Sequence, residues 1–159
     1  MISIALKDEA ASIALGGELA RALGDRRAGW MLLLKGDLGA GKSTVARALL
    51  RALGHKGSVP SPTYTLVEPY DLSSGYIYHI DLYRISSLEE LEHLGWSDLS
   101  DGLILLEWPE KAPEVMQQAD VLVELTYEGI GRRAVVSALS ARAQQIVSSL
   151  DQSTTYGHR

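Results

Sequence analysis

The sequence predicts a three-layer α/β domain with a mixed, mainly parallel central sheet. Two short apolar runs, residues 30–34 and 103–106, are typical of parallel strands that are buried on both faces. The stretch 36–44, just after the first run, reads Gly-Asp-Leu-Gly-Ala-Gly-Lys-Ser-Thr and fits the pattern G-x-x-x-x-G-K-S/T without a mismatch. Apolar residues then recur at helical spacing as far as Gly54. A strand, a glycine loop and a helix in this order turn backbone N–H groups and a helix N-terminus toward a phosphate chain.

Length and composition narrow the class of protein. The 159 residues predict one domain, residues 1–150, followed by a polar tail, residues 151–159, that is expected to fray. A net charge of −5 gives no strong field that would attract nucleic acid. The absence of cysteine excludes a disulfide scaffold and a thiolate metal site, and it is compatible with a reducing cytoplasm. Residues 1–6 show no secretory signal, and no apolar run approaches the roughly 20 residues that span a bilayer. We therefore expect a cytoplasmic protein without a membrane partner.

The first elements precede the glycine loop. Residues 1–6 alternate weakly in polarity and predict a short edge strand. Asp8 is a suitable N-cap for a helix that runs to about Leu23, although Gly16 and Gly17 argue against one straight helix. The residues expected on the packed face of this helix are Ala11, Ile13, Ala14, Leu19 and Leu23.

A proline-rich segment follows the helix of the glycine loop. Residues 55–65 contain two prolines and several hydroxyl side chains, which indicates an extended loop. The next two segments, 66–70 and 75–80, have the residue types of strands, and residues 71–74 form the turn between them.

The middle of the chain combines short helices with the second buried strand. Ser86 and Glu89 have the spacing of a capping box, which predicts a helix through about His93. After the apolar strand 103–106, a proline begins a segment, 109–118, that we expect to form a short helix.

The last part of the chain predicts a hairpin and a helix. Residues 121–127 and 133–139 read as adjoining strands, and residues 128–131 carry the turn signal between them. Ser140 is expected to cap a final helix that ends at about Leu150.

The glycine loop supplies the residue types that a P-loop NTPase uses. Glycines lack a Cβ atom, so the loop backbone can adopt left-handed angles and approach phosphate oxygens. Lys42 would place a positive charge on the β- and γ-phosphates, Ser43 would offer a hydroxyl to Mg²⁺, and Thr44 would either touch the α-phosphate or cap the helix. The residues expected to bind the nucleotide are Gly36, Asp37, Leu38, Gly39, Ala40, Gly41, Lys42, Ser43 and Thr44.

Two acidic residues end the strands expected beside this loop. Asp81 follows the strand 75–80 and Glu107 follows the strand 103–106, so both carboxylates would lie at the edge of the sheet where ligands bind. Either one could hold Mg²⁺. Trp108 would close over such a site or bury its ring, and burial is the favoured interpretation. His79 has no second ligand at metal-binding spacing and is interpreted as structural, as is His93.

Four blocks of sequence together look like the bacterial TsaE (YjeE) family. The blocks are 36–44, 61–68, 78–84 and 106–108, in matching order and spacing, and the similarity covers about residues 1–140. The resemblance implies a Mg²⁺-dependent ATPase that is required for threonylcarbamoyladenosine formation next to the anticodon of tRNAs reading codons that begin with A. It also implies action with the TsaB–TsaD pair, while TsaC makes the threonylcarbamoyl donor and the TsaE protein does not itself perform the transfer.

The resemblance also implies roles for individual residues. Lys42, Asp81 and Glu107 would be catalytic. Ser43 and Glu107 would ligate the metal, and Asp81, in a switch segment, would contribute to the same site. Further positions are Arg132, near the nucleotide, and Thr44 and the switch or partner candidate Trp108, which would be functionally required. Apart from the resemblance, the loop 61–65 lies where many phosphate-loop switches carry a threonine near the γ-phosphate, so Thr63 and Thr65 are switch or partner candidates; a Pro-rich turn that enters a strand is the equally weighted alternative. The residue that orients the attacking water remains open among Thr65, Glu68 and Asp81.

Other functions compete with ATP hydrolysis. A small nucleotide or metabolite kinase shares the loop, but such enzymes use an arginine-rich helical lid, and the chain after Glu107 ends in a predicted strand pair with Arg132 and Arg133. A GTPase lacks support because no Asn-Lys-x-Asp segment is present. A transporter-type ATPase lacks its Leu-Ser-Gly-Gly-Gln segment as well. In a non-catalytic alternative, ATP only sets an assembly state.

Overall fold

The computed structural model describes residues 1–25, 27–62 and 66–156, with side chains as far as residue 151. Strands and α-helices alternate as far as β3, and 3-10 turns occur between several of the later elements. The elements are β1 (Ile2–Leu6), α1 (Glu9–Leu23), β2 (Met31–Gly36), α2 (Lys42–Ala52), β3 (Val67–Leu72), β4 (Gly75–Asp81), α3 (Leu88–His93), η1 (Trp96–Leu99), β5 (Gly102–Glu107), η2 (Pro109–Lys111), η3 (Pro113–Gln117), β6 (Val121–Glu128), β7 (Gly131–Ala138), η4 (Ala141–Ala143) and α4 (Gln144–Tyr156).

The described strands form one sheet of seven strands in the order β1-β7-β6-β2-β5-β4-β3. β2 lies in the middle and pairs in parallel with β5 on one side and β6 on the other, and β4 continues the parallel set. β7 and the edge strand β3 run antiparallel to their neighbours, and Pro69 of β3 lies opposite Tyr78. The prediction of a mixed, mainly parallel sheet with the loop after an inner strand is confirmed.

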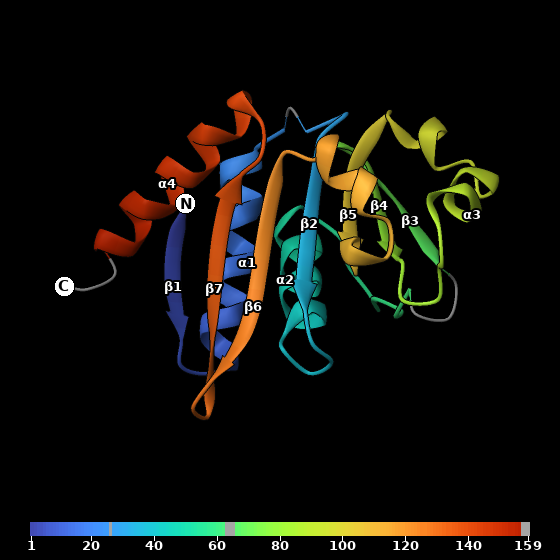
Figure 1. Ribbon diagram of the computed structural model, residues 1–159. Helices are drawn as coiled ribbons and strands as arrows, with labels where there is room; N and C mark the ends of the chain where they lie inside the picture. The colour runs from blue at the N-terminus through green and yellow to red at the C-terminus, as the bar shows by residue number, and fades with distance from the viewer. Residues whose placement is uncertain (26, 63–65, 157–159) are drawn as a thin grey trace.

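Helices and turns cover both faces of the sheet, which confirms the three layers (Figure 1). One core lies between the sheet and the helices α1, α2 and α4; Leu19, Leu49 and Ile146 are among its buried residues. The second core lies on the opposite face, under α3 and the 3-10 turns; Leu91, Trp96 and Val115 contribute to it. The central strands are buried on both faces, which explains why their sequences are continuous apolar runs.

Helix α1 begins as predicted, and its packed face agrees with the prediction in part: Leu19 and Leu23 are buried and Ala11 packs against the core. Asp8 caps it by accepting a hydrogen bond from the Ala11 N–H at 2.9 Å. Ile13, expected in the packed face, is 49% exposed, and Ala14 is exposed as well. Gly16 is buried instead, because at this position α1 approaches α2 so closely that an added Cβ would lie 2.6 Å from Ala48 Cβ. The packed face consists of Ser12, Leu15, Gly16, Leu19, Ala20 and Leu23.

Three later elements differ from the prediction at their ends. α3 is capped by Ser87 rather than Ser86, so it begins one residue later. The segment 109–118 forms two 3-10 turns instead of one helix, since prolines begin both of them. Ser140 makes no side-chain cap, because its hydroxyl donates to Asp120; the last helix begins after η4 and continues to Tyr156, beyond the expected end at Leu150.

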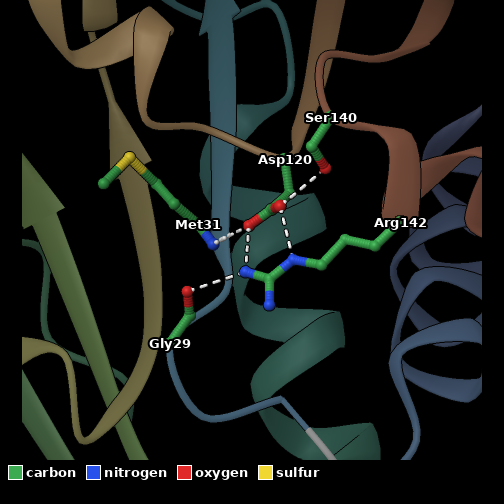
Figure 2. Close-up of polar contacts among 5 residues, drawn as sticks. All are labelled: Gly29, Met31, Asp120, Ser140 and Arg142. Carbon is green, nitrogen blue, oxygen red and sulfur yellow. Dashed lines mark hydrogen bonds and ion pairs between the residues drawn. The ribbon is translucent and has the colours of Figure 1, made fainter.

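Asp120 joins three segments at the amino ends of β2 and β6 (Figure 2). Its carboxylate, almost fully buried, accepts hydrogen bonds from the Met31 N–H at 2.9 Å and the Ser140 hydroxyl at 2.7 Å. Arg142 donates to both carboxylate oxygens at 2.8 and 2.9 Å and to the carbonyl of Gly29 at 2.9 Å. This cluster lies at the end of the sheet opposite the glycine loop. It fixes the start of two central strands against the C-terminal segment.

Within residues 1–25, 27–62 and 66–156, no helix combines the length and the apolar character needed to cross a bilayer.

Candidate functional site

The glycine loop connects β2 to α2 at the carboxyl end of the sheet. Gly39 and Gly41 have φ angles of 80° and 109°, which side chains with a Cβ atom rarely adopt. Gly36 is required for a different reason: an added Cβ would lie 2.7 Å from the carbonyl oxygen of Leu125 on β6. Gly41 precedes α2 without a side-chain cap. The loop therefore leaves the first amides of α2 to a ligand.

The β6–β7 hairpin holds the outer side of this loop. The Tyr127 hydroxyl donates to the carbonyl of Leu38 at 2.6 Å, and the Arg132 Nη2 donates to the carbonyl of Gly39 at 3.1 Å. The Arg132 guanidinium lies 4.2 Å from the centre of the Tyr127 ring. Two carbonyls of the loop thus face the hairpin. Arg132 contacts the loop itself, and Tyr127 is a residue that the sequence reasoning missed.

Both predicted carboxylates lie in the cleft of the glycine loop. Asp81 and Glu107 are register partners at the ends of β4 and β5, and Glu107 is also the partner of Leu34 on β2. Both are 3% exposed. The cleft has a volume of about 190 Å³. Its lining consists of Asp37, Leu38, Gly39, Gly41, Lys42, Ser43, Thr44, Asp81, Glu107 and Trp108.

His79 reaches the same site from inside the sheet. Residues 77, 79 and 81 of β4 share one face, because side chains alternate along a strand. The His79 Nε2 lies 2.5 Å from Glu107 Oε2, and both side chains are almost fully buried. Its Nδ1 is buried without a hydrogen-bond partner among the described residues. The interpretation of His79 as merely structural missed this contact; its two-residue spacing from Asp81 was the available signal.

Lys42 lies in the wall of the cleft and is 6% exposed. Its ammonium contacts the carbonyl oxygen of Gly36, lies 3.4 Å from that of Asp37 and lies 3.8 Å from the centre of the Trp108 ring. Burial lowers the pKa of Lys42 below the ordinary lysine value, and nearby carboxylates, that of Glu107 first, act in the opposite direction. An anionic ligand at this place would compensate the buried charge.

Trp108 is a wall of the cleft. Its backbone is left-handed, with φ 61° and ψ 51°, which turns the chain away at the end of β5. The ring is half-buried between the ammonium of Lys42 and the ring of Tyr83, whose centre is 5.0 Å away. The favoured expectation of burial holds in part, because the ring also packs against the second core. The ring lines the cleft as well, and its closing over a site beside Glu107 stays a prediction.

Asp81 is fixed by its own turn. One of its oxygens accepts a hydrogen bond from the Tyr83 N–H at 2.8 Å, and its backbone N–H donates to the carbonyl of Leu66 at 2.9 Å. Leu66 has a φ of 70°, an unusual angle for a residue with a Cβ atom. The switch candidates Thr63 and Thr65 lie outside the described residues.

The donor atoms in the cleft are oxygens, the ligands that Mg²⁺ prefers. Ser43 is exposed and contributes a hydroxyl, and the two buried acids contribute carboxylates. No group of three or more His, Cys, Asp or Glu side chains suited to a metal occurs in the part of the chain that the structure describes. A Mg²⁺ ion held by one or two carboxylates together with substrate phosphates and waters fits this donor set.

A second cleft adjoins the first. It has a volume of about 270 Å³ and shares Gly39, Gly41 and Thr44 with the first cleft. Its remaining lining comes from the end of β1, the start of α1 and the β6–β7 hairpin: Leu6, Asp8, Glu9, Ser12, Ile130, Gly131 and Arg132. The glycine loop thus lines both clefts.

The sequence that forms these two clefts is similar to a known protein family. The model of the family described as "Threonylcarbamoyl adenosine biosynthesis protein TsaE" matches residues 6–135. This chain belongs to the TsaE family. The family match contains the glycine loop, Asp81, Glu107 and Arg132, and so it covers both clefts.

Relatives in the TsaE family are similar over most of the chain. The protein from Haemophilus influenzae is 44% identical over 75% of this chain and 77% of its own length. The one from Nostoc sp. is 32% identical over 94% of this chain and 93% of its own length. Both are called tRNA threonylcarbamoyladenosine biosynthesis protein TsaE. The crystal structure of Bacillus subtilus YdiB has the same fold, with a TM-score of 0.74, 24% identity and coverage of 96% of this chain and 95% of its own.

Proposed function

We propose that the chain binds Mg·ATP in the two clefts, hydrolyses the γ-phosphate, and serves in this way the biosynthesis of threonylcarbamoyladenosine in tRNA. One observation carries the proposal: Lys42, Ser43 and the two strand-end carboxylates meet in one cleft at the start of α2. Family membership supplies the pathway, since the relatives are named for it. Both lines of support are independent, because one rests on geometry and the other on sequence similarity.

The polyphosphate would lie in the first cleft. The uncapped amides at the start of α2 would donate to phosphate oxygens, and the helix dipole would favour their negative charge. The Lys42 ammonium, now against loop carbonyls and the Trp108 ring, would move to the β- and γ-phosphates. The hydrogen bonds from Tyr127 and Arg132 would keep the loop in its shape during this exchange.

The bound Mg²⁺ would neutralise charge on the phosphates and orient them for in-line attack by water. Ser43 and Glu107 are the residues that would hold it, and Asp81 would join them directly or through water. The ribose and base would extend into the second cleft, past Thr44 and toward Arg132.

We further propose that hydrolysis is slow in the isolated chain and is coupled to the TsaB–TsaD pair, so that tRNA is reached through the complex. The competing kinase function receives no support from the structure. The described chain after Glu107 forms 3-10 turns, the β6–β7 hairpin and α4, and no arginine-rich helical lid occurs there.

Glu107→Ala tests the proposal. We expect calorimetry to detect ATP binding with some affinity retained, because the loop and Lys42 are intact, whereas hydrolysis and tRNA modification fall at least a hundredfold. Both are measured with and without the TsaB–TsaD pair and tRNA, and Glu114→Ala, at an exposed 3-10 turn, is the control. Modified tRNA formed at the normal rate by Glu107→Ala would refute the hydrolytic role.

Incubation with ATP and nucleoside monophosphates tests the kinase alternative, which predicts stoichiometric nucleoside diphosphate.

A further inference from the structure

We propose that His79 is a positioning residue, which holds the Glu107 carboxylate in the orientation that receives the metal. The inference rests on the proposed function and adds to it a residue on β4 that does not line the cleft. It is carried by the contact between His79 Nε2 and Glu107 Oε2 at 2.5 Å.

The contact leaves one oxygen of Glu107 for the cleft. Glutamate has three rotatable side-chain bonds, so a buried carboxylate without a partner could turn in several directions. Nε2–H donation to Oε2 removes this freedom and occupies one carboxylate oxygen, so that Oε1 is left for a ligand in the cleft that Glu107 lines together with Ser43. Metal ligands commonly depend on such outer partners for their orientation.

The second ring nitrogen of His79, Nδ1, supports the same conclusion. Among the described residues, His79 Nδ1 is buried without a hydrogen-bond partner, and burying such an atom costs free energy. The neighbouring core residues Ile77 and Leu105 are fully buried and apolar, so a leucine would suit this position better if packing were its only task. A histidine at this position therefore costs stability, and its contact with the Glu107 carboxylate is the interaction that a leucine could not make.

Two amide variants separate positioning from packing. In His79→Gln, the amide nitrogen is about as far from the backbone as Nε2 of the histidine, so it can still donate to Glu107. In His79→Asn, the amide nitrogen is only about as far from the backbone as Nδ1 of the histidine, so it does not reach Glu107. Both are uncharged and polar, so each leaves an amide in the same buried place. His93→Asn on the exposed side of α3 is the matched control.

The experiment measures Mn²⁺ binding to the full chain by electron paramagnetic resonance, in the presence of a non-hydrolysable ATP analogue. We expect His79→Asn to weaken Mn²⁺ binding roughly 10- to 100-fold, and His79→Gln and His93→Asn to stay within about threefold of the wild type. Affinity for the metal-free analogue, measured by calorimetry, should remain unchanged in all three variants because the loop is intact. Urea unfolding is recorded for each variant in parallel.

Each outcome decides one question. Equal Mn²⁺ affinity of His79→Asn and the wild type would overturn the positioning role while leaving the proposed function standing. Equal weakening in His79→Asn and His79→Gln, or a loss of metal-free analogue binding in parallel with stability, would assign His79 a packing role instead. Absence of analogue-dependent Mn²⁺ binding in the wild type would refute the proposed function itself.

Discussion

At the scale of single residues, the contact between Lys42 and Trp108 links the site to an observable signal. The ammonium lies over the indole ring at 3.8 Å. A cation–π contact contributes about 0.5–1 kcal/mol at an exposed site and about 2 kcal/mol when desolvated, whereas a polyphosphate offers several hydrogen bonds to charged groups, each of about 1.5–3 kcal/mol. A bound polyphosphate should therefore draw the ammonium away from the ring.

We predict that ATP changes the fluorescence of Trp108. Titration of the wild type should give a saturable change, whereas Trp108→Phe should give none, because Trp30 and Trp96 lie together at the other end of the sheet. Calorimetry on Trp108→Phe shows whether ATP still binds. A variant that binds ATP and keeps the full fluorescence response would contradict the prediction.

The residues themselves show where sequence patterns stop being informative. Lys42, Asp81 and Glu107 follow from the loop motif and from strand ends, because parallel strands bring their carboxyl ends to one edge. His79 and Tyr127 act through contacts across strands and loops that are far apart in sequence. The two-residue spacing of His79 from Asp81 indicates only that both share a face of β4, and it does not identify Glu107 as the partner of His79.

At the scale of elements, the packing of α1 on α2 depends on one of two adjacent glycines. A Cβ on Gly16 would lie 2.6 Å from Ala48 Cβ and 2.7 Å from the carbonyl oxygen of Val45, while a Cβ on Gly17 would meet nothing within 4 Å. The low helix propensity of glycine marks both positions as weak points of a helix, but it does not show that the close approach of a neighbouring helix requires one of them.

We predict opposite effects of alanine at these two positions. Gly17→Ala should raise the free energy of unfolding by about 0.5–1 kcal/mol, because alanine loses less backbone entropy on folding. Gly16→Ala should lower it by about 1–3 kcal/mol, because the overpacking exceeds that gain. Urea unfolding of both variants decides the point. Stabilisation by Gly16→Ala would show that the two helices can separate without cost.

The elements whose ends were wrongly predicted share a cause. Ser86 and Ser140 both have the residue type of a cap, but each hydroxyl takes another partner: Ser86 donates to the side chain of Glu90, four residues on, and Ser140 donates to Asp120 across the fold. A cap motif indicates that a residue is able to cap an isolated helix. Competing side-chain partners, near in sequence for Ser86 and distant for Ser140, decide the outcome in the fold.

At the scale of the whole molecule, the sheet separates the candidate site from a stabilising cluster. The clefts lie at the carboxyl ends of the central strands, and Asp120 lies at their amino ends. Burial alone raises the pKa of Asp120, but hydrogen bonds from Arg142, Ser140 and the Met31 N–H together hold it below the ordinary value. The ionised form is therefore favoured by folding.

We predict that Asp120 contributes stability that acid removes. Because its pKa is lower in the folded state, the contribution is complete above the unfolded pKa of about 4 and is lost as pH falls through the folded value. Asp120→Asn should lower the free energy of unfolding by about 1–3 kcal/mol at pH 7, and the difference from the wild type should shrink toward pH 3. Urea unfolding at both pH values measures this, with the exposed Asp98→Asn as control.

ATP should stabilise the wild type and Asp120→Asn equally at pH 7. At a concentration of 100 times Kd, the expected increment is about 2.7 kcal/mol for both proteins. A smaller increment in the variant would show that the two ends of the sheet are coupled.

The strand order of the sheet also affects how the molecule meets other copies of itself. β3 pairs with β4 on one side only, and Pro69 lies in its middle. A proline fits an edge strand where its nitrogen points outward, so this border lacks one donor that an incoming strand would need. The edge strand β3 is therefore a poor template for fibril growth. Replacing Pro69 by a residue with a backbone N–H would remove that protection.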